Sequence, residues 1–372
     1  MSIAARSSYY GLAVGTPKLK SVGSLAFGPD GILFVADNAA ATIFALDVGD
    51  AGHAEETRPL EVANLDTLLA AYLGCSREDV YVRDMAVHPR SQHLYLSVMR
   101  GSGAAAIPVL LKMDQEGKVS EVRLERIPFS QTAVQDAPSE HDPRMDGHLV
   151  QGDREGEVME PRPGFRLRIA REPLRAVTVT DMAYVDGMLL VAGASNEEFS
   201  STLRRIPFPF NGNASSNSLE IYHVSHAKYE TASPIRTFLP YAGSTSVLAS
   251  YTCTPVVHFS LKDLKPGAKV KGRTVAELGA GNTPLDMVSF SRDGEEYLLV
   301  SNARHPLMKL TCSDIEHQEP LTQPREPVGV PRQKLPHQGV SRMVNLNGSY
   351  VAMLQLDGTG NYHLHSYSTA EL

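Results

Sequence analysis

A pair of strands that recurs six times is the feature that most constrains how this chain can fold. Each copy has an apolar run, a connecting turn and a second apolar run, which is the pattern of a β-hairpin. The copies are SLAFGPDGILFVADN (24–38), DMAVHPRSQHLYLSV (84–98), DMAYVDGMLLVAGASN (181–196), IRTFLPYAGSTSVLASY (235–251), DMVSFSRDGEEYLLVSN (286–302) and RMVNLNGSYVAMLQL (342–356). The chain is therefore predicted to be all-β and built from one repeated unit.

The spacing of the copies gives the size of that unit. Measured from Ser24, Asp84, Asp181, Arg236, Asp286 and Arg342, the intervals are 60, 97, 55, 50 and 56 residues. A four-stranded propeller blade with short loops needs roughly 40–50 residues, so each interval holds one blade. We predict a single six-bladed β-propeller over residues 1–372. The alternative is seven blades, with the extra blade in the segment after Ser130.

The end of the chain indicates how the ring closes. Residues 361–368 are typical of a third strand of the last blade, and four residues follow them. We expect residues 9–22 to supply the fourth strand of that blade, because a ring closed by an N-terminal strand leaves no open sheet edge.

Three connections between the predicted blades are long, and long loops often carry function. They are residues 64–81, 133–163 and 319–337. The first contains a predicted helix over Leu65–Leu73, between Asn64 as N-cap and Gly74 as its end. The second is interpreted as an irregular polar insertion between blades. The third is rich in proline and therefore extended.

Composition excludes several classes of function. The chain has 35 Lys and Arg against 42 Asp and Glu, a formal charge of −7, and no basic tail, so no nucleic-acid partner is expected. No apolar run is long enough to span a membrane, and we expect a soluble protein, periplasmic or secreted after loss of a signal peptide rather than cytoplasmic. Trp is absent, which argues against the WD40 and quinoprotein propellers. With three isolated cysteines and no nucleotide-binding glycine motif, no haem, NAD or PQQ is expected.

Two copies resemble repeats of a known kind. VADNAAATIFALDV (35–48) and FSRDGEEYLLVSN (290–302) are similar to the repeats of YVTN, NHL and SMP-30-type β-propellers. The resemblance implies the architecture, which serves lactonases, strictosidine-synthase-like enzymes, electron-transfer partners and binding scaffolds. SMP-30 and paraoxonase types use a Glu, Asn and Asp cluster around a channel calcium. That cluster has no position-by-position match here, and Ser24 stands where an acidic ligand is expected.

Repeated aspartates predict a polar mouth at one end of the ring. Asp84, Asp181 and Asp286 each start the first strand of a blade and are each followed by Met. Carboxylates gathered at one channel repel each other unless a cation, an arginine or a proton intervenes. We predict a divalent cation, Ca²⁺ above all, bound by these three residues. The alternative is structural: each Asp accepts backbone N–H bonds and joins its blade to the next.

Arginine replaces Asp at the same position in two blades. Arg236 and Arg342 bring positive charge beside the carboxylates, either as internal ion pairs or as a pocket for an anionic or zwitterionic ligand. The ends of the second strands face the same mouth, and their polar residues are predicted to bind that ligand: Asn38, Tyr251, Asn302 and Arg304.

Histidines are the candidate proton-transfer groups. His305 or His337 is predicted to act as general base, because an imidazole titrates near neutral pH. Asp146-Gly147-His148 in the insertion has metal-ligand residue types, but composition alone does not make a site. His223 and His226 lie three apart on a predicted strand, so we expect them to point to opposite faces.

Together these features predict a propeller that binds a small molecule or a metal at one mouth. If the protein is an enzyme, the resemblance implies a metal-assisted hydrolase of lactone or ester type. The cation would polarise a carbonyl, and His305 or His337 would transfer a proton. The alternative is a non-catalytic propeller that binds a small-molecule ligand or a protein partner and in which the aspartates are structural.

Overall fold

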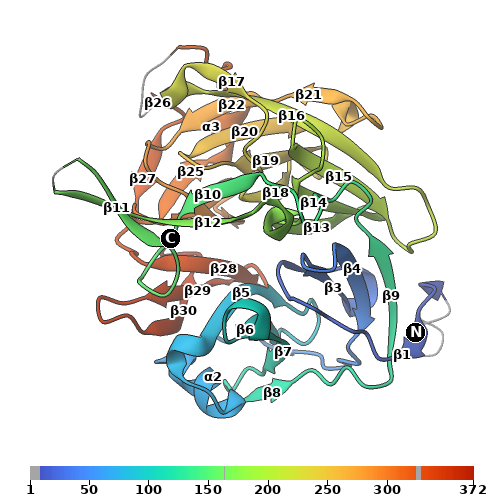
Figure 1. Ribbon diagram of the computed structural model, residues 1–372. Coiled ribbons are helices and arrows are strands. Elements are labelled where there is room, and N and C mark those ends of the chain that lie inside the picture. Colours follow the sequence, from blue (N-terminus) through green and yellow to red (C-terminus); the bar gives the residue numbers. More distant parts are fainter. Residues whose placement is uncertain (1–8, 163, 324–327) are drawn as a thin grey trace.

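All six repeats form antiparallel strand pairs in the computed structural model, which describes residues 9–162, 164–323 and 328–372 (Figure 1). Each pair begins one sheet, and we number these sheets I to VI in chain order. Sheet I contains β2 (Leu25–Phe27), β3 (Ile32–Asp37), β4 (Thr42–Asp47), β9 (Ile127–Ala133) and β1 (Ala13–Gly15). Sheet II contains β5 (Val80–Val87), β6 (Leu94–Arg100), β7 (Ile107–Met113) and β8 (Val119–Glu121).

The later sheets have the same plan. Sheet III contains β13 (Asp181–Val185), β14 (Met188–Ala194), β15 (Ser201–Pro207), β16 (Ser215–His223), β17 (Lys228–Glu230) and β21 (Lys269–Lys271). Sheet IV contains β18 (Thr237–Tyr241), β19 (Ser246–Ser250), β20 (Pro255–Ser260), β22 (Arg273–Glu277) and β26 (Val328–Gly329). Sheet V contains β23 (Pro284–Arg292), β24 (Glu295–Asn302), β25 (Met308–Thr311) and β27 (Arg332–Lys334). Sheet VI contains β28 (Val340–Leu346), β29 (Tyr350–Leu356) and β30 (Tyr362–Ser368).

The second strand of each sheet has apolar residues on both of its faces because it serves two cores. In β3, Ile32 and Phe34 pack in one core with Leu189 of sheet III. Leu33, which points the other way, packs in a second core with Tyr95 of sheet II. Six cores of this kind each join two neighbouring sheets.

The order of the sheets in space differs from their order in the chain. The first strands contact one another in the order β2, β5, β28, β23, β18 and β13, and β13 also contacts β2. Sheet II therefore lies between sheets I and VI, while sheet III lies beside sheet I. After sheet II the chain returns to sheet I, where β9 pairs with β4, before it continues to sheet III.

The N-terminal strand lies at a different edge from the one predicted. In β1, Ala13 pairs with Phe129 of β9, so β1 joins sheet I and the prediction that it completes the last sheet is wrong. The outer strand of sheet VI is instead covered by the connection between sheets I and II. Val62 exchanges two backbone hydrogen bonds of 2.9 Å with Leu364 in β30. At Leu364, the backbone groups that the N-terminal strand was expected to pair are thus already in use.

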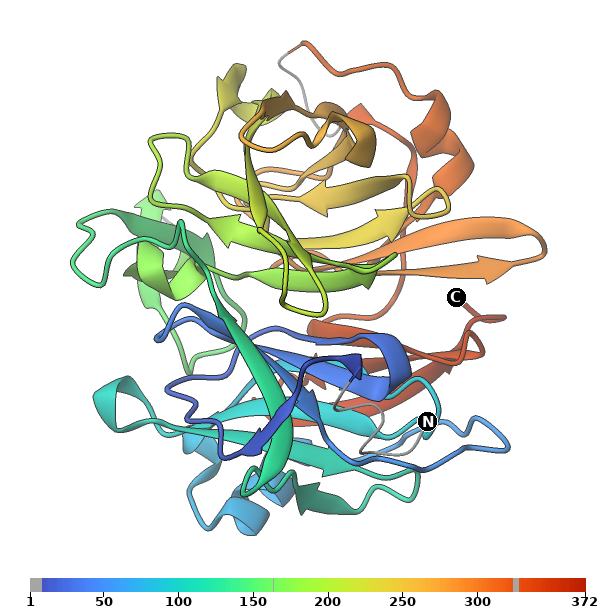
Figure 2. The same cartoon turned by 90° about the vertical axis from the view of Figure 1, so that its right-hand side faces the viewer.

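The insertion folds into a separate sheet, which we call the cover sheet. Its strands are β10 (Met145–Leu149), β12 (Phe165–Pro173) and β11 (Glu157–Arg162), in that order. Figure 1 shows it across the middle of one face, and Figure 2 shows the same strands at the edge of the molecule. The expectation of an irregular loop over 133–163 is wrong, because β10 and β11, which lie within it, each pair with β12.

Two α-helices lie in the described part of the chain, α2 (Leu65–Leu73) and α3 (Cys312–His317). The bounds of α2 are those predicted, and Gly74 ends it with φ of 65°. Asn64 does not act as predicted, because its side chain makes no capping hydrogen bond. In the part of the chain that the structure describes, no helix is long and apolar enough to cross a membrane.

Candidate ligand-binding cavity

The three repeated aspartates join neighbouring sheets. Asp84 Oδ2 accepts the Leu25 N–H of sheet I at 2.7 Å, and Asp181 Oδ2 accepts the Phe238 N–H of sheet IV at 2.8 Å. Asp286 Oδ2 accepts the Met343 N–H of sheet VI at 2.6 Å. The second oxygen of each carboxylate accepts the N–H of the methionine that follows it, at 2.7–2.8 Å. This is the geometry of the alternative in which each Asp accepts backbone N–H bonds and joins its sheet to a neighbouring one.

Burial raises the pKa of all three aspartates. For Asp181 the charges of Asp84 and Asp286 add to the effect, and its pKa lies well above the usual range. The pKa of Asp286 rises to about 7, mainly through burial and the charge of Asp84, although Arg342 opposes the shift. Two groups in the described part of the chain have three ligand atoms within 4.8 Å of one another, and neither contains these aspartates. Calcium binding by them stays a prediction.

A cavity of about 1130 Å³ lies between the cover sheet and the starts of the first strands. It is lined by Ser24 and Asn38 of sheet I, by Arg342 of sheet VI and by residues of the cover sheet. Its basic lining residues are Lys20, Arg83, Arg154, Arg171, Arg175, Arg236 and Arg342, and its acidic ones are Glu140, Glu155, Glu157 and Glu172. The lining therefore has an excess of basic residues, whereas the whole chain carries a formal charge of −7.

A charged cluster attaches the cover sheet to sheet IV inside this cavity. Arg236 Nη2 donates to both oxygens of Asp146 at 2.7 and 2.6 Å, and its Nε donates to Thr252 Oγ1 at 2.9 Å. His148 Nδ1 lies 3.2 Å from Asp146 Oδ2 and 3.7 Å from Glu172 Oε1. Burial alone would raise the pKa of Asp146, but His148 and Arg236 outweigh it and lower the pKa to about 2.

Arg236 lines this cavity, but its ion pair with Asp146 was not predicted from the sequence. Asp146, the partner of Arg236, lies on the cover sheet together with His148 and Glu172. One ligand atom from each of these three residues lies within 4.8 Å of the other two. The Asp-Gly-His motif was visible in the sequence. Without the pairing of β10 with β12, nothing in it indicated that Asp146 lies opposite Glu172.

Arg342 and Asn38 also line the cavity, and both hold backbone. Arg342 donates from Nε to the Arg83 carbonyl at 2.8 Å and from Nη1 to two further carbonyls at 2.8 and 3.2 Å. The Asn38 amide donates to the carbonyls of Ala176 and Val179 and accepts the Val179 N–H at 2.9 Å. Asn38 therefore fixes the end of the insertion, and its side chain is fully used.

A second, smaller pocket of about 320 Å³ brings together three other predicted residues. Asn302, Arg304 and His305 line it with residues 150–152, which lead out of β10. Asn302 is 2% exposed and donates to Val300 and Pro306 carbonyls, so it supports the pocket rather than offering a free amide. His305 has a lowered pKa through burial and through the charges of Lys334 and Arg304.

His337 and Tyr251 are not brought to either pocket. His337 packs against Tyr367, with ring centroids 4.2 Å apart, and burial lowers its pKa. Tyr251 is 1% exposed in the core between sheets III and IV. The prediction that Tyr251 faces the mouth is wrong because the chain still points this side chain inward after β19 ends.

No protein-family model matches the chain. A search of curated proteins gives no match either. Among solved structures, the chain is similar to the RRP9 WD40 repeats, with 10% identity, 96% of this chain and 97% of that chain covered, and a TM-score of 0.39. It is also similar to the β-propeller domain of Myceliophteria thermophila Cps50 (Swd1), with 13% identity, 93% and 84% coverage and a TM-score of 0.38.

A third similar structure is a Thermus thermophilus protein described as a putative oxidoreductase (glucose dehydrogenase). It shares 13% identity, with 96% of this chain and 100% of that chain covered, and its TM-score is 0.34. At these scores no partner or activity carries over to this chain.

Proposed function

We propose that the protein is a six-bladed β-propeller that binds a small organic anion, without catalysis, in the cavity beneath the cover sheet. The observation that carries the proposal is the charge of the cavity lining. Seven basic residues face four acidic ones there, in a chain that is acidic as a whole. A ligand of negative charge fits that potential.

Two lining arginines are held rigidly by backbone carbonyls. Arg342 is fixed by three backbone carbonyls, and Arg175 donates to the carbonyls of Asn38, Ala39 and Pro138. Among the described residues, neither has a carboxylate within ion-pair distance. A guanidinium that is already immobilised is suited to a carboxylate or phosphate, because little side-chain entropy is lost on binding.

The six cores support the blade number and the closure of the ring. Each sheet shares one core with each of two neighbours, and the contacts return from sheet III to sheet I. In this proposal the cover sheet is the roof of the binding site and not a seventh blade. His148, held by Asp146, adds a polar group to the roof.

A ligand screen by thermal shift tests this function. Small dicarboxylates, tricarboxylates and phosphate esters are compared with neutral amides and alcohols of the same size, at low and high salt. We expect at least one anion to raise the melting temperature, with a shift that falls as salt rises. Arg342→Met should reduce the shift strongly, Arg342→Lys less, and Arg123→Met, an exposed control outside the cavity, not at all.

Two results would count against the anion site. Neutral compounds that stabilise the protein as well as anions do would remove the charge argument. Full retention of anion binding in Arg342→Met would show that the ligand lies elsewhere. The metal-assisted hydrolase of lactones or esters remains a separate prediction, and it requires a cation on Asp84, Asp181 or Asp286.

A further inference from the structure

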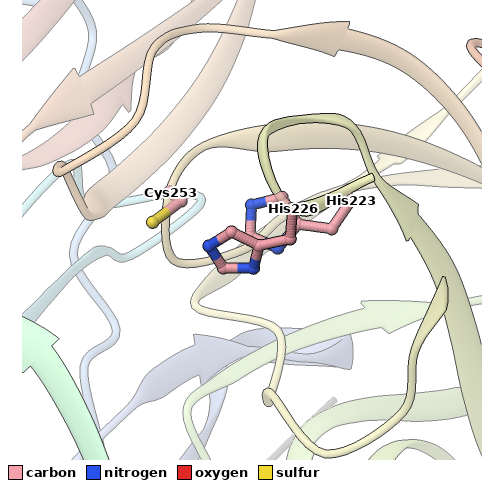
Figure 3. Close-up of side chains that lie close together, drawn as sticks. All are labelled: His223, His226 and Cys253. Atoms are coloured by element: carbon pink, nitrogen blue, oxygen red, sulfur yellow. The ribbon is translucent and has the colours of Figure 1, made fainter. Parts of the chain in front are cut away.

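A second cluster of metal-ligand side chains lies outside the cavity, between sheets III and IV. His223 ends β16, His226 ends the short 3₁₀ helix η5 (Val224–His226), and Cys253 follows β19. One ligand atom from each lies within 4.8 Å of the other two. Figure 3 shows the two imidazoles side by side with the Cys253 thiol next to them. None of the three lines the cavity described above.

The expectation that His223 and His226 point to opposite faces is wrong. The strand ends at His223 and the chain turns at once into η5, so a spacing of three residues corresponds to about one helical turn. The two ring centroids are 4.0 Å apart as a result. Ala227 follows with φ of 54° and directs the chain into β17, which carries Glu230.

One carboxylate orients both imidazoles. Glu230 Oε2 lies 2.7 Å from His223 Nδ1, and Glu230 Oε1 lies 2.7 Å from His226 Nδ1. With the ring proton on each Nδ1 donated to Glu230, both Nε2 atoms keep a lone pair. A carboxylate on the far nitrogen is the usual outer-shell partner of metal-bound histidine, because it fixes the tautomer and the ring orientation.

The buried side of the cluster is His223 Nε2. His223 is 2% exposed, and this nitrogen has no hydrogen bond of good geometry with the described residues. Oε1 of Glu277, a residue that is 0% exposed, lies 3.4 Å from it at ion-pair distance. A cation next to His223 Nε2 would satisfy this nitrogen and offset the negative charge of Glu277 and of a Cys253 thiolate.

We propose that His223, His226 and Cys253 bind a divalent transition metal, with Zn²⁺ as the best fit, and that Glu230 is its outer-shell carboxylate. Imidazole and thiolate are the ligands that Zn²⁺ prefers, and three of them leave a fourth position of a tetrahedron open. Glu277, whose Oε1 lies 3.4 Å from His223 Nε2, is the candidate for that position. With the ring protons on Nδ1, His223 Nε2 and His226 Nε2 bind through their lone pairs, and binding releases the proton of the Cys253 thiol to solvent.

The competing explanation is a hydrogen-bonded cluster without metal. Burial opposes a proton on His223, but Cys253, Glu230 and Glu277 outweigh it and raise the pKa of His223 to about 11. In that case His223 is an imidazolium between acidic groups, and the cluster has no affinity for zinc. Direct metal binding distinguishes the two.

The experiment uses the full-length protein, stripped of metal with a chelator and dialysed. Zn²⁺ alone is titrated by calorimetry, and Co²⁺ alone is used as a spectroscopic probe for thiolate coordination. We expect one equivalent of Zn²⁺ and a thiolate-to-cobalt charge-transfer band. Because His226 is exposed, His226→Gln should weaken Zn²⁺ binding at least tenfold without unfolding the protein. Cys253→Ser should abolish the charge-transfer band.

Matched controls separate this site from others. Cys75→Ser changes a free cysteine elsewhere and should leave both signals intact. His148→Gln changes the other three-ligand group, Asp146, His148 and Glu172, and should leave the stoichiometry at one. The proposal is overturned if the wild-type protein binds no Zn²⁺, if His226→Gln binds it as tightly as wild type, or if His148→Gln removes it.

Discussion

At the scale of single residues, each aspartate at the start of a first strand joins its own sheet to a neighbouring one. Sheets II, III and V carry the accepting aspartate, and sheets I, IV and VI donate the backbone N–H of the second hydrogen bond. Sheets that carry the aspartate alternate with sheets that donate to it around the contact order, so the six repeats form three joined pairs. A carboxylate that accepts two backbone N–H groups leaves few lone pairs for a cation. Metal binding by these residues would therefore compete with the junctions.

The raised pKa of Asp286 predicts a pH dependence of stability. Its pKa rises from 3.8 to about 7, through burial and the charge of Asp84. Between these two values the folded state binds more protons than the unfolded state, so the free energy of unfolding falls as pH rises, and the loss is complete above pH 7. Relative to Asp286→Asn, the wild type should lose up to about 2 kcal/mol between pH 5 and pH 7, measured by urea denaturation.

Asp263→Asn provides the control for this measurement, because Asp263 is exposed. That variant should follow the wild-type pH dependence. A constant difference in unfolding free energy between Asp286→Asn and wild type from pH 5 to pH 7 would contradict this prediction. It would mean that Asp286 does not titrate in this range, because the two N–H groups stabilise the carboxylate more than burial destabilises it.

At the scale of elements, the hairpins were predictable and the added strands were not. The turns Asp293-Gly294 and Asn347-Gly348 have positive φ at both residues, as tight hairpin turns require, and their sequence types indicate this directly. The strand β9 has no such signal, and in the cover sheet only residues 165–169 of β12, where apolar and basic residues alternate in the sequence, are typical of a strand. In β10, residues Met145–Leu149, polar and apolar side chains do not alternate, because the strand is held by backbone pairing and by the Asp146 ion pair instead of by an apolar face.

This attachment of the cover sheet is testable through Asp146. Asp146 and the Arg236 side chain are 7% and 8% exposed, so removing the carboxylate leaves an almost buried guanidinium without its partner. Asp146→Asn should speed limited proteolysis within residues 133–173 at least tenfold, while the unfolding of the six sheets changes less. Because the pKa of Asp146 is lowered to about 2, the wild type should keep the attachment above about pH 4 and lose it as pH falls toward 2.

Asp153→Asn serves as the matched control, since Asp153 is exposed in the same insertion. It should be cleaved at the wild-type rate. Equal cleavage rates for Asp146→Asn and wild type would mean that backbone pairing alone holds the cover sheet.

The position of the N-terminal strand can be tested by engineered disulfides. Ala13 and Phe129 are directly paired in an antiparallel ladder, where Cα atoms lie about 4.5–5.5 Å apart, within the range that a disulfide spans. Ala13→Cys combined with Phe129→Cys should form a disulfide under mild oxidation, observed by mass spectrometry. Ala13→Cys with His365→Cys, placed on the last strand, should not. The opposite result would restore the closure predicted from the sequence.

At the scale of the whole molecule, the repeat determines what each sheet is but not which sheet lies beside it. Every second strand is apolar on both faces, so each sheet offers similar surfaces to any neighbour. Ile32 of sheet I packs with sheet III, and Leu33 packs with sheet II, yet the two residues are alike in type. The order in space depends on the long connections, above all on the return of the chain through β9. This is why the neighbours of sheet I could not be predicted from the hairpins.

The contact between sheets I and III is the part of this order that a double-mutant cycle tests most directly. Phe34 of β3 and Phe208, which follows β15, meet edge to face with ring centroids 4.8 Å apart and an angle of 89°. Such a pair contributes about 0.5–1.5 kcal/mol beyond burial, so Phe34→Leu and Phe208→Leu should be non-additive by that amount in urea denaturation. Phe34→Leu with Phe259→Leu, a buried residue of a different core, should be additive within about 0.5 kcal/mol. Additivity of the first pair would mean that these two rings do not interact, which would contradict the contact between sheets I and III at this point.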